Sequence, residues 1–220
     1  MGDKGMADKV PHSASLSDGL YIVGFGFVAM YVLEAGDYLV AFDSGMRPAV
    51  LLAEFARLGL DPSRVSHVFL THTDSDHTGG IKALSNARVF LSEDEVPMVT
   101  RAMPRFFSFI FNKPPYGGYE ALVDSQELSV GNARIRCICT PGHTPGSMSF
   151  LVNDRILIVG DILNLDKGRV VMDRGIINMD PNKRKQSILK LARLRNISLL
   201  CTMHSGYSMD FDTAMREWRT

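Results

Sequence analysis

The sequence predicts one domain of mixed α and β structure. Short runs of β-forming residues alternate with helical stripes of apolar residues, and this alternation occurs in both halves of the chain. The 220 residues, 45% of them hydrophobic and 22% charged, suffice for one sizeable soluble core or for two tightly packed halves. The periodicity alone indicates this mixed class and does not order the strands into sheets.

The composition argues against several classes of partner. The 24 Lys and Arg residues balance the 24 Asp and Glu residues, so no global field draws the chain to nucleic acid or an acidic membrane. No apolar run resembles a secretory signal or reaches a membrane-spanning length. The three cysteines, Cys137, Cys139 and Cys201, are odd in number and lack C-x-x-C spacing, so a disulfide framework is not expected. Cys137 and Cys139 share one face of an expected strand and are expected to be small buried hydrophobic residues. We therefore expect a cytoplasmic protein with no nucleic-acid or membrane partner.

The first half is predicted to be a β-meander followed by a helix and further strands. Residues 1–17 are expected to form a flexible tail, whose first five residues resemble a cloning remnant, and residues 18–220 form the domain. The expected strands are 20–23, 28–34, 38–42, 65–70 and 89–91. One helix begins at Pro48 and ends at Gly59, a short one covers 81–84, and a capping box at 92–95 opens another.

The second half repeats this order. Strands are expected near 122–128 and at 133–139, 148–152, 155–159 and 197–202, with a hairpin turn at Asn153-Asp154. Asp180 is expected to cap a helix that runs to Leu194, and Asp210 or Asp212 a final helix. The basic residues of the longer helix are expected to face solvent: Lys183, Arg184, Lys185 and Arg193.

A dense cluster of metal-ligand residue types follows the expected strand 65–70. Four candidates lie within six residues: His72, Asp74, Asp76 and His77. Imidazole and carboxylate groups are ordinary ligands of zinc, iron and manganese. Because Asp76 and His77 are consecutive and must diverge, two neighbouring metals are indicated, whereas the alternative is a solvated polar turn. Each of three later apolar runs is followed by one more candidate: His143, Asp161 and His204.

The order of these segments resembles the metallo-β-lactamase superfamily, whose pattern is H-x-H-x-D-H, then a lone His, a bridging Asp and a last His. The resemblance runs from about Leu20 to His204 and implies a four-layer αββα sandwich with two divalent metal ions. It implies that one metal is held by His72, Asp74 and His143, the other by Asp76, His77 and His204, and that Asp161 bridges them. Zinc is the metal most expected, with iron or manganese as alternatives.

Two further features follow from this resemblance. Asp43 matches the superfamily's first motif, where an Asp supports the metal loops, although a turn or helix-capping Asp is an equal alternative. Asp74 departs from the pattern, because the family usually has His there, and the extra carboxylate should acidify a bound water less and favour iron or manganese. Flavodiiron proteins resemble this variant but have Glu, which is one methylene longer, so the reach of Asp74 is in question.

The segment at about 101–119 is rich in aromatic residues. It is interpreted as a lid or wall that contributes an apolar substrate pocket, with satellite core or a homodimer contact as alternatives. The candidate pocket residues are Phe106, Phe107, Phe109, Tyr116 and Tyr119.

The leading functional hypothesis is a dinuclear metal-dependent hydrolase acting on a small-molecule ester, thioester, lactone or phosphodiester. A metal-bridging hydroxide would be the nucleophile, with Asp161 as the bridge and Asp76 orienting the nucleophile or receiving its proton. The second hypothesis is a di-iron or mono-iron oxygen-handling oxidoreductase related to the flavodiiron catalytic domain, which would need an external electron donor. The third is a metal-stabilised binding protein without catalysis.

Overall fold

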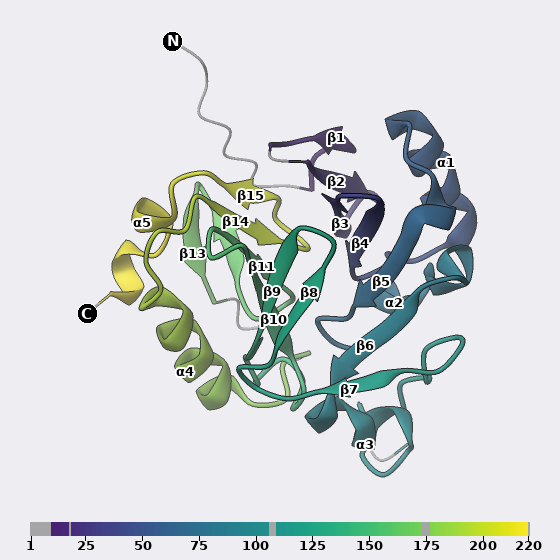
Figure 1. Cartoon of the computed structure of the whole chain (residues 1–220). Coiled ribbons are helices and arrows are strands. Elements are labelled where there is room, and N and C mark those ends of the chain that lie inside the picture. The colour runs from purple at the N-terminus through teal and green to yellow at the C-terminus, as the bar shows by residue number, and fades with distance from the viewer. Residues whose placement is uncertain (1–9, 18, 106–108, 173–176, 220) are drawn as a thin grey trace.

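Two β-sheets packed face to face, with helices on their outer sides, form the protein (Figure 1). The computed structural model describes residues 10–17, 19–105, 109–172 and 177–219. The first sheet has seven described strands in the order β1 (Ala14–Ser15), β2 (Leu20–Gly24), β3 (Ala29–Ala35), β4 (Tyr38–Phe42), β5 (Val65–Phe69), β6 (Arg88–Ser92) and β7 (Glu120–Leu122). The second has six in the order β15 (Tyr207–Ser208), β14 (Leu199–Thr202), β11 (Ile156–Val159), β10 (Met148–Val152), β9 (Ala133–Cys139) and β8 (Glu127–Val130).

The helices are short apart from one on each outer side. The α-helices are α1 (Pro48–Leu58), α2 (Ser75–Thr78), α3 (Val96–Val99), α4 (Pro181–Ala192) and α5 (Phe211–Ala214). The 3-10 helices are η1 (Pro62–Arg64), η2 (Ile81–Leu84), η3 (Glu93–Glu95) and η4 (Arg216–Trp218), and a small separate sheet pairs β12 (Asn164–Asp166) with β13 (Arg169–Val171). None of the helices in the described ranges is long and apolar enough to cross a membrane.

Three hydrophobic clusters hold the layers together. The largest lies between the two sheets and includes Tyr31 and Phe42 from the first sheet and Phe150 from the second. A second cluster joins the outer face of the second sheet to α4, and a third joins the outer face of the first sheet to α1. Figure 1 shows α1 and α4 on opposite sides of the molecule, which is the four-layer αββα order that the sequence analysis expected.

The strand directions bring several loops to one edge. Strands β4 to β7 are parallel, so β4, β5 and β6 end on the same side of their sheet. Strands β9 and β11 both run antiparallel to β10, and β14 is parallel to β11, so these three also end together. The two sets of loops meet, because Met148 donates its backbone N–H to the Thr71 carbonyl over 2.8 Å.

The structure differs from the expected local structure at several positions, the last of which is the basic face of α4. The expected strand near 122–128 is divided between β7 and β8, which belong to different sheets, because Ser125 has a left-handed φ of 64° and reverses the chain. Residues 14–15 of the expected tail pair with β2, and the pairing of β12 with β13 was not foreseen. Ser92 caps η3, but the Glu95 side chain does not complete a capping box. It is fully buried and bonds to Thr73 and Thr144 instead.

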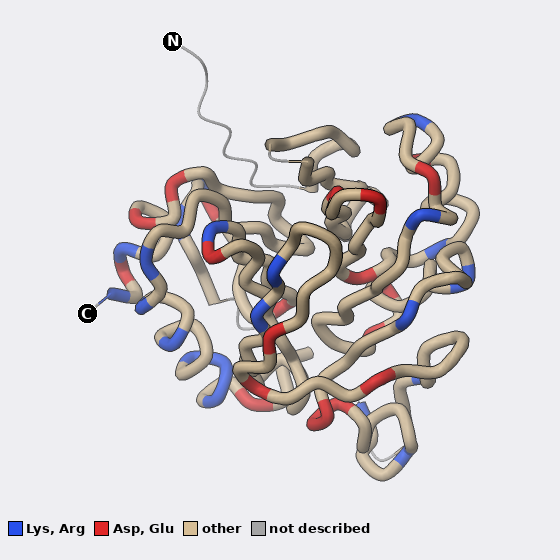
Figure 2. The backbone as a smooth tube through the Cα atoms, in the orientation of Figure 1, with Lys and Arg blue, Asp and Glu red and all other residues tan. Residues whose placement is uncertain are grey.

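A further correction concerns the basic face of α4. Figure 2 shows basic positions along this helix, and Lys183 and Lys185 are exposed as expected. Arg184 is instead 1% exposed, and its Nε donates to the Ile162 carbonyl over 2.7 Å. Its Nη2 donates to the Asp161 carbonyl over 3.1 Å, so α4 braces the backbone that carries Asp161.

Candidate metal centre

The loop after β5 presents the four clustered candidates at the edge where the sheets meet. Strand β5 is anchored by buried Val68 and Phe69, and His72 and His77 are buried as well. Asp74 occupies the N-cap position of α2, but its side chain makes no capping hydrogen bond and points to the site instead. The loop packs tightly below, since a Cβ on Gly79 or Gly80 would lie 2.0 Å from a backbone carbonyl oxygen.

Asp43 supports this loop from beneath. Its Oδ2 lies 2.7 Å from His77 Nδ1, and its two carboxylate oxygens accept hydrogen bonds from the Thr71 backbone N–H and hydroxyl over 2.7 and 2.8 Å. A proton held on Nδ1 leaves the His77 Nε2 lone pair facing the site. Arg47, and not Asp43, is the N-cap of α1, so the supporting role is favoured over the capping alternative.

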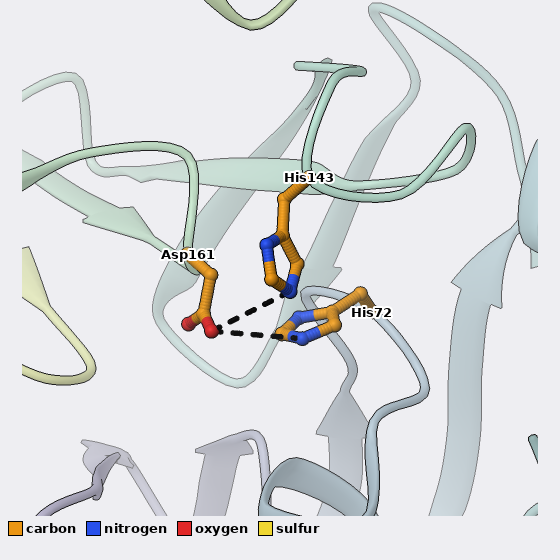
Figure 3. Close-up of side chains that lie close together, drawn as sticks. All are labelled: His72, His143 and Asp161. Atoms are coloured by element: carbon orange, nitrogen blue, oxygen red, sulfur yellow. Dashed lines mark ion pairs between the residues drawn. The ribbon is translucent and has the colours of Figure 1, made fainter. Parts of the chain in front are cut away.

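The first cluster consists of His72, His143, Asp161 and Asp74. Asp74 Oδ2 lies 3.2 Å from His143 Nε2 and 3.5 Å from His72 Nε2. Asp161 Oδ2 lies 3.5 Å from His143 Nε2 and 4.0 Å from His72 Nε2, and Figure 3 shows these three side chains converging. Ligand atoms about 2.05 Å from a tetrahedral metal lie roughly 3.3 Å from one another, so these separations fit one metal ion.

The second cluster consists of Asp76, His77, His204 and again Asp161. His77 Nε2 lies 3.6 Å from Asp76 Oδ2 and 3.4 Å from Asp161 Oδ1. His204 Nε2 lies 3.5 Å from Asp76 Oδ2 and 3.2 Å from Asp161 Oδ2. The His204 ring is oriented by the Phe27 carbonyl, 2.8 Å from its Nδ1. Asp161 thus contacts both clusters, and the structure brings all seven candidate ligands together.

Three buried polar atoms show that these clusters fit metal ions. His72 Nε2, His77 Nε2 and Asp161 Oδ1 have no hydrogen-bond partner among the described residues. A buried polar group left unpaired costs about 1–3 kcal/mol, so native proteins rarely keep several together without a reason. One of these atoms faces the first cluster and two face the second, where a cation would pair with each. Histidine and carboxylate ligands are those that zinc, iron and manganese share.

Opposite charges dominate the electrostatics of the centre. Burial alone would lower the pKa of His77, but the charges of Asp161 and Asp43 raise it well above its usual value. Burial would raise the pKa of Asp161, yet the charge of His77 and a hydrogen bond from His204 hold it well below its usual value. The Asp161 carboxylate is therefore ionised, which is the form that binds metal.

Arg105 is a site residue that the sequence analysis missed. Its Nε and Nη2 donate to Asp74 Oδ1 and Oδ2 over 2.7 and 2.8 Å, forming a two-bond fork. Its side chain is 1% exposed, and Nη1 donates to the Ile177 carbonyl over 2.8 Å. Asn112 Nδ2 donates to Asp74 Oδ1 over 3.1 Å from the same segment of chain. The extra carboxylate at position 74 was the signal in the sequence that a nearby cation is needed.

Glu95 is the second site residue that was missed. Its Oε1 accepts hydrogen bonds from the Thr73 backbone N–H and hydroxyl over 2.9 and 2.7 Å. Its Oε2 accepts from the Thr144 hydroxyl over 2.7 Å and from the Gly146 N–H over 3.2 Å. Glu95 therefore ties the loop that carries His72 to the loop that carries His143.

Two cavities open at the centre. One of about 390 Å³ is lined by the candidate ligands Asp74, Asp76, His143, Asp161 and His204, together with Phe27 and Ile177. The other, of about 650 Å³, lies over Asp74 and Asp76 and is bordered by the segment 110–116. The described lining also includes Arg105, and Arg105, Asn112 and Lys113 add polar and charged groups beside the apolar side chains of the segment.

The five candidate pocket residues have different environments. Tyr116 lines the larger cavity, and Lys82 Nζ lies 5.4 Å from the centre of its ring. Phe109 is 72% exposed, and the described linings of the two cavities do not include it. Tyr119 packs against the outer core of the first sheet. Phe106 and Phe107 lie outside the described residues.

Comparisons with known proteins agree with this geometry. The family model of the metallo-beta-lactamase superfamily matches residues 23–204. The chain is 28% identical over 190 residues to the lactamase-like protein adaB of Aspergillus niger, covering 86% of this chain and 53% of that protein. It is 33% identical over 135 residues to an atrochrysone carboxyl ACP thioesterase of Aspergillus fumigatus, covering 60% of this chain and 38% of that protein. The chain thus spans about half or less of these curated relatives.

Solved structures share the fold. A metallo-beta-lactamase family protein from Thermus thermophilus superposes with a TM-score of 0.68 at 24% identity, covering 92% of this chain and 79% of that chain. A B3 metallo-beta-lactamase described as the first with an active-site glutamic acid superposes with a TM-score of 0.72 at 22% identity, covering 96% and 88%.

Proposed function

Because the chain belongs to the metallo-β-lactamase superfamily, we propose that it is a metal-dependent hydrolase with a dinuclear site and a small-molecule substrate. The observation that carries this proposal is the convergence of seven ligand side chains on two clusters that share Asp161. Three buried ligand atoms without hydrogen-bond partners in the described structure support a metal in each cluster.

The chain's own residues would divide the work as follows. His72, Asp74 and His143 would hold the first metal and Asp76, His77 and His204 the second, with Asp161 between them. Divalent ions bound there would supply Lewis-acid polarisation of a substrate carbonyl or phosphoryl oxygen and would acidify an attacking water. Asp76 is partly exposed and borders both cavities, so its carboxylate is placed to orient that water or to accept its proton.

A thioester is the first bond to test. One relative is described as a carboxyl ACP thioesterase, and its match covers 60% of this chain. The larger cavity offers Arg47, Lys82 and Lys113 near the candidate metals, and these cations suit an acyl chain or carrier that bears negative charge. Oxygen esters, lactones and phosphodiesters complete the panel.

The geometry gives less support to the two other hypotheses, an oxygen-handling oxidoreductase and a non-catalytic binding protein. The oxygen-handling oxidoreductase was favoured by the extra negative charge of Asp74, and the Arg105 fork offsets that charge. A purely binding role was favoured if Asp74 failed to reach the first cluster, but Asp74 Oδ2 lies 3.2 and 3.5 Å from the two histidine nitrogens. No observation on the described residues singles out either alternative.

The test is hydrolysis of a panel of acyl thioesters, esters, a lactone and a phosphodiester, with metal content measured on the same preparation. Zinc-loaded protein should turn over at least one class, and Asp161→Ala should abolish turnover and lower metal content. Asp154→Ala, which removes an exposed carboxylate from a hairpin turn, is the matched control and should change neither. Turnover retained by Asp161→Ala, or no turnover by protein with two bound metals, would refute the proposal.

A further inference from the structure

We propose that Arg105 is a positioning residue that makes Asp74 an effective ligand of the first metal and cancels its extra charge. The inference rests on the proposed function only in assuming two metal sites. Its basis is the pairing of Asp74 with Arg105, which lies 31 positions later in the chain. At the position of Asp74 the family pattern has a neutral His, which needs no such partner.

The fork assigns different tasks to the two oxygens of Asp74. Oδ1 accepts hydrogen bonds from Arg105 Nε over 2.7 Å and from Asn112 Nδ2 over 3.1 Å, which occupies both of its lone pairs. Oδ2 accepts a hydrogen bond from Arg105 Nη2 over 2.8 Å, and its other lone pair faces the histidine side of the first cluster, at hydrogen-bond distance from His143 Nε2. That oxygen lies 3.2 Å from His143 Nε2 and 3.5 Å from His72 Nε2, which are ligand-to-ligand distances.

The guanidinium is itself held in place, so the fork fixes the carboxylate. Arg105 is 1% exposed at its side chain, and its third nitrogen donates to the Ile177 carbonyl over 2.8 Å. A short Asp can thus serve where its reach was in question, because a bidentate partner keeps it in one orientation.

The charge balance explains why an Arg is required. Asp74, Asp76 and Asp161 bring three negative charges to the centre, and Arg105 returns one positive charge, which leaves a net of two negative charges. A neutral His at position 74 would leave Asp76 and Asp161, with the same net charge. The Asp74 and Arg105 pair is therefore electrostatically equivalent to one His, and the expected shift of metal preference towards iron or manganese is offset.

The opposite role for Arg105 would be to occupy the first site in place of a metal. Its Nη2 does lie 3.0 Å from His143 Nε2. A guanidinium that replaced the metal would also hydrogen-bond to His72, the other histidine of the first cluster. His72 Nε2 nevertheless has no hydrogen-bond partner in the described structure. The first cluster therefore keeps an unsatisfied ligand that Arg105 does not reach.

The experiment measures the affinity of both sites for zinc by chelator competition, with cobalt absorption as an independent signal. Arg105→Gln should weaken one of the two sites by about 10- to 100-fold, as expected for the loss of a ligand's partner, and Arg105→Lys should lie between because it keeps charge but not the fork. The matched control is Arg88→Gln, which removes an equivalent fork to Glu120 on the surface and should leave both affinities unchanged.

A second variant keeps the test valid if Arg105→Gln folds poorly. Asp74→His combined with Arg105→Gln restores the charge balance with a neutral ligand, so this double variant should regain two tight sites. Asp74→His alone places an imidazole against the guanidinium and should bind the first metal more weakly than the double variant does.

Three results would overturn the proposal. The first is an unchanged zinc affinity in Arg105→Gln. The second is a higher metal content in that variant, which would show that Arg105 competes with the metal. The third is a wild-type protein that binds fewer than two metal ions. None of these readouts uses hydrolysis. Two tight metals that respond to Arg105 without any turnover would refute the proposed function and leave the role of Arg105 standing.

Discussion

Replacing Asp43 by Asn tests whether the support beneath the second cluster sets metal affinity. Asp43 is fully buried and accepts three short hydrogen bonds, from His77 Nδ1 and from the backbone N–H and hydroxyl of Thr71. An Asn has nearly the same shape but only one accepting oxygen, and its NH₂ group must face one of these donors. If it faces His77, the imidazole must place its proton on Nε2, where the metal would bind.

The magnitude follows from these contacts. Losing the carboxylate beside a histidine ligand is expected to weaken metal binding by about 10- to 100-fold. If the NH₂ group instead faces Thr71, two donors oppose each other in a buried position, which costs about 1–3 kcal/mol of unfolding free energy. Asp43→Asn should therefore lose metal affinity, stability, or both, although its volume is unchanged.

Chelator competition for zinc and urea unfolding of the metal-free protein separate the two effects. Asp37→Asn, an exposed isosteric change on the turn between β3 and β4, is the control and should alter neither value. Wild-type zinc affinity together with wild-type stability in Asp43→Asn would show that Asp43 only fills space, and the reasoning would be refuted.

Two further predictions concern groups buried near the centre. Tyr31→Phe should lower the unfolding free energy by about 1–2 kcal/mol in urea titration, because the single hydroxyl proton is shared between the carbonyls of Thr202 and Gly206, on either side of His204, over 3.0 and 3.1 Å. Unchanged stability would contradict this. The thiols should be unreactive towards Ellman's reagent at pH 8 and all react in guanidinium, because burial raises the pKa of Cys137 to about 12 and that of Cys139 to about 11, and raises the pKa of Cys201. A thiol stays protonated and unreactive when the pH is below its pKa, so at pH 8 these three thiols should not react in the folded protein. Reaction with the native protein at pH 8 would contradict this prediction.

The secondary-structure elements, and the convergence of the candidate ligands, were predictable because their signals are local. Strands such as β4 and β9 were placed at their observed bounds by runs of β-forming residues, and α1 by its proline start and glycine end. Each candidate ligand directly follows or closely trails a strand, and parallel strands end on a common edge. The candidate ligands therefore lie close together, independently of the conformations of the intervening loops. The αββα order came from the resemblance, because periodicity does not pair strands.

The buried charged residues were missed because their partners are distant in the chain. Glu95 lies in an S-x-x-E pattern that also describes a capping box, and only the fold shows that its partners are 22 and 49 residues away. Arg184 did carry a signal, since it precedes Ile188 by four residues and Leu191 by seven and so shares their inward face. Its basic neighbours concealed that periodicity.

The Arg105 contact also changes the meaning of the aromatic segment that carries it. This segment was expected to serve the substrate, and Tyr116 and Phe111 do line the larger cavity. The same segment supplies Arg105 and Asn112 to Asp74, so the wall of the cavity and one candidate metal ligand share a single support. A substitution that displaces the segment should therefore change metal affinity and substrate binding together, whereas one confined to an exposed ring such as Phe109 should leave the metal unaffected. The position that departs from the family pattern is thus held by the aromatic-rich segment of the chain.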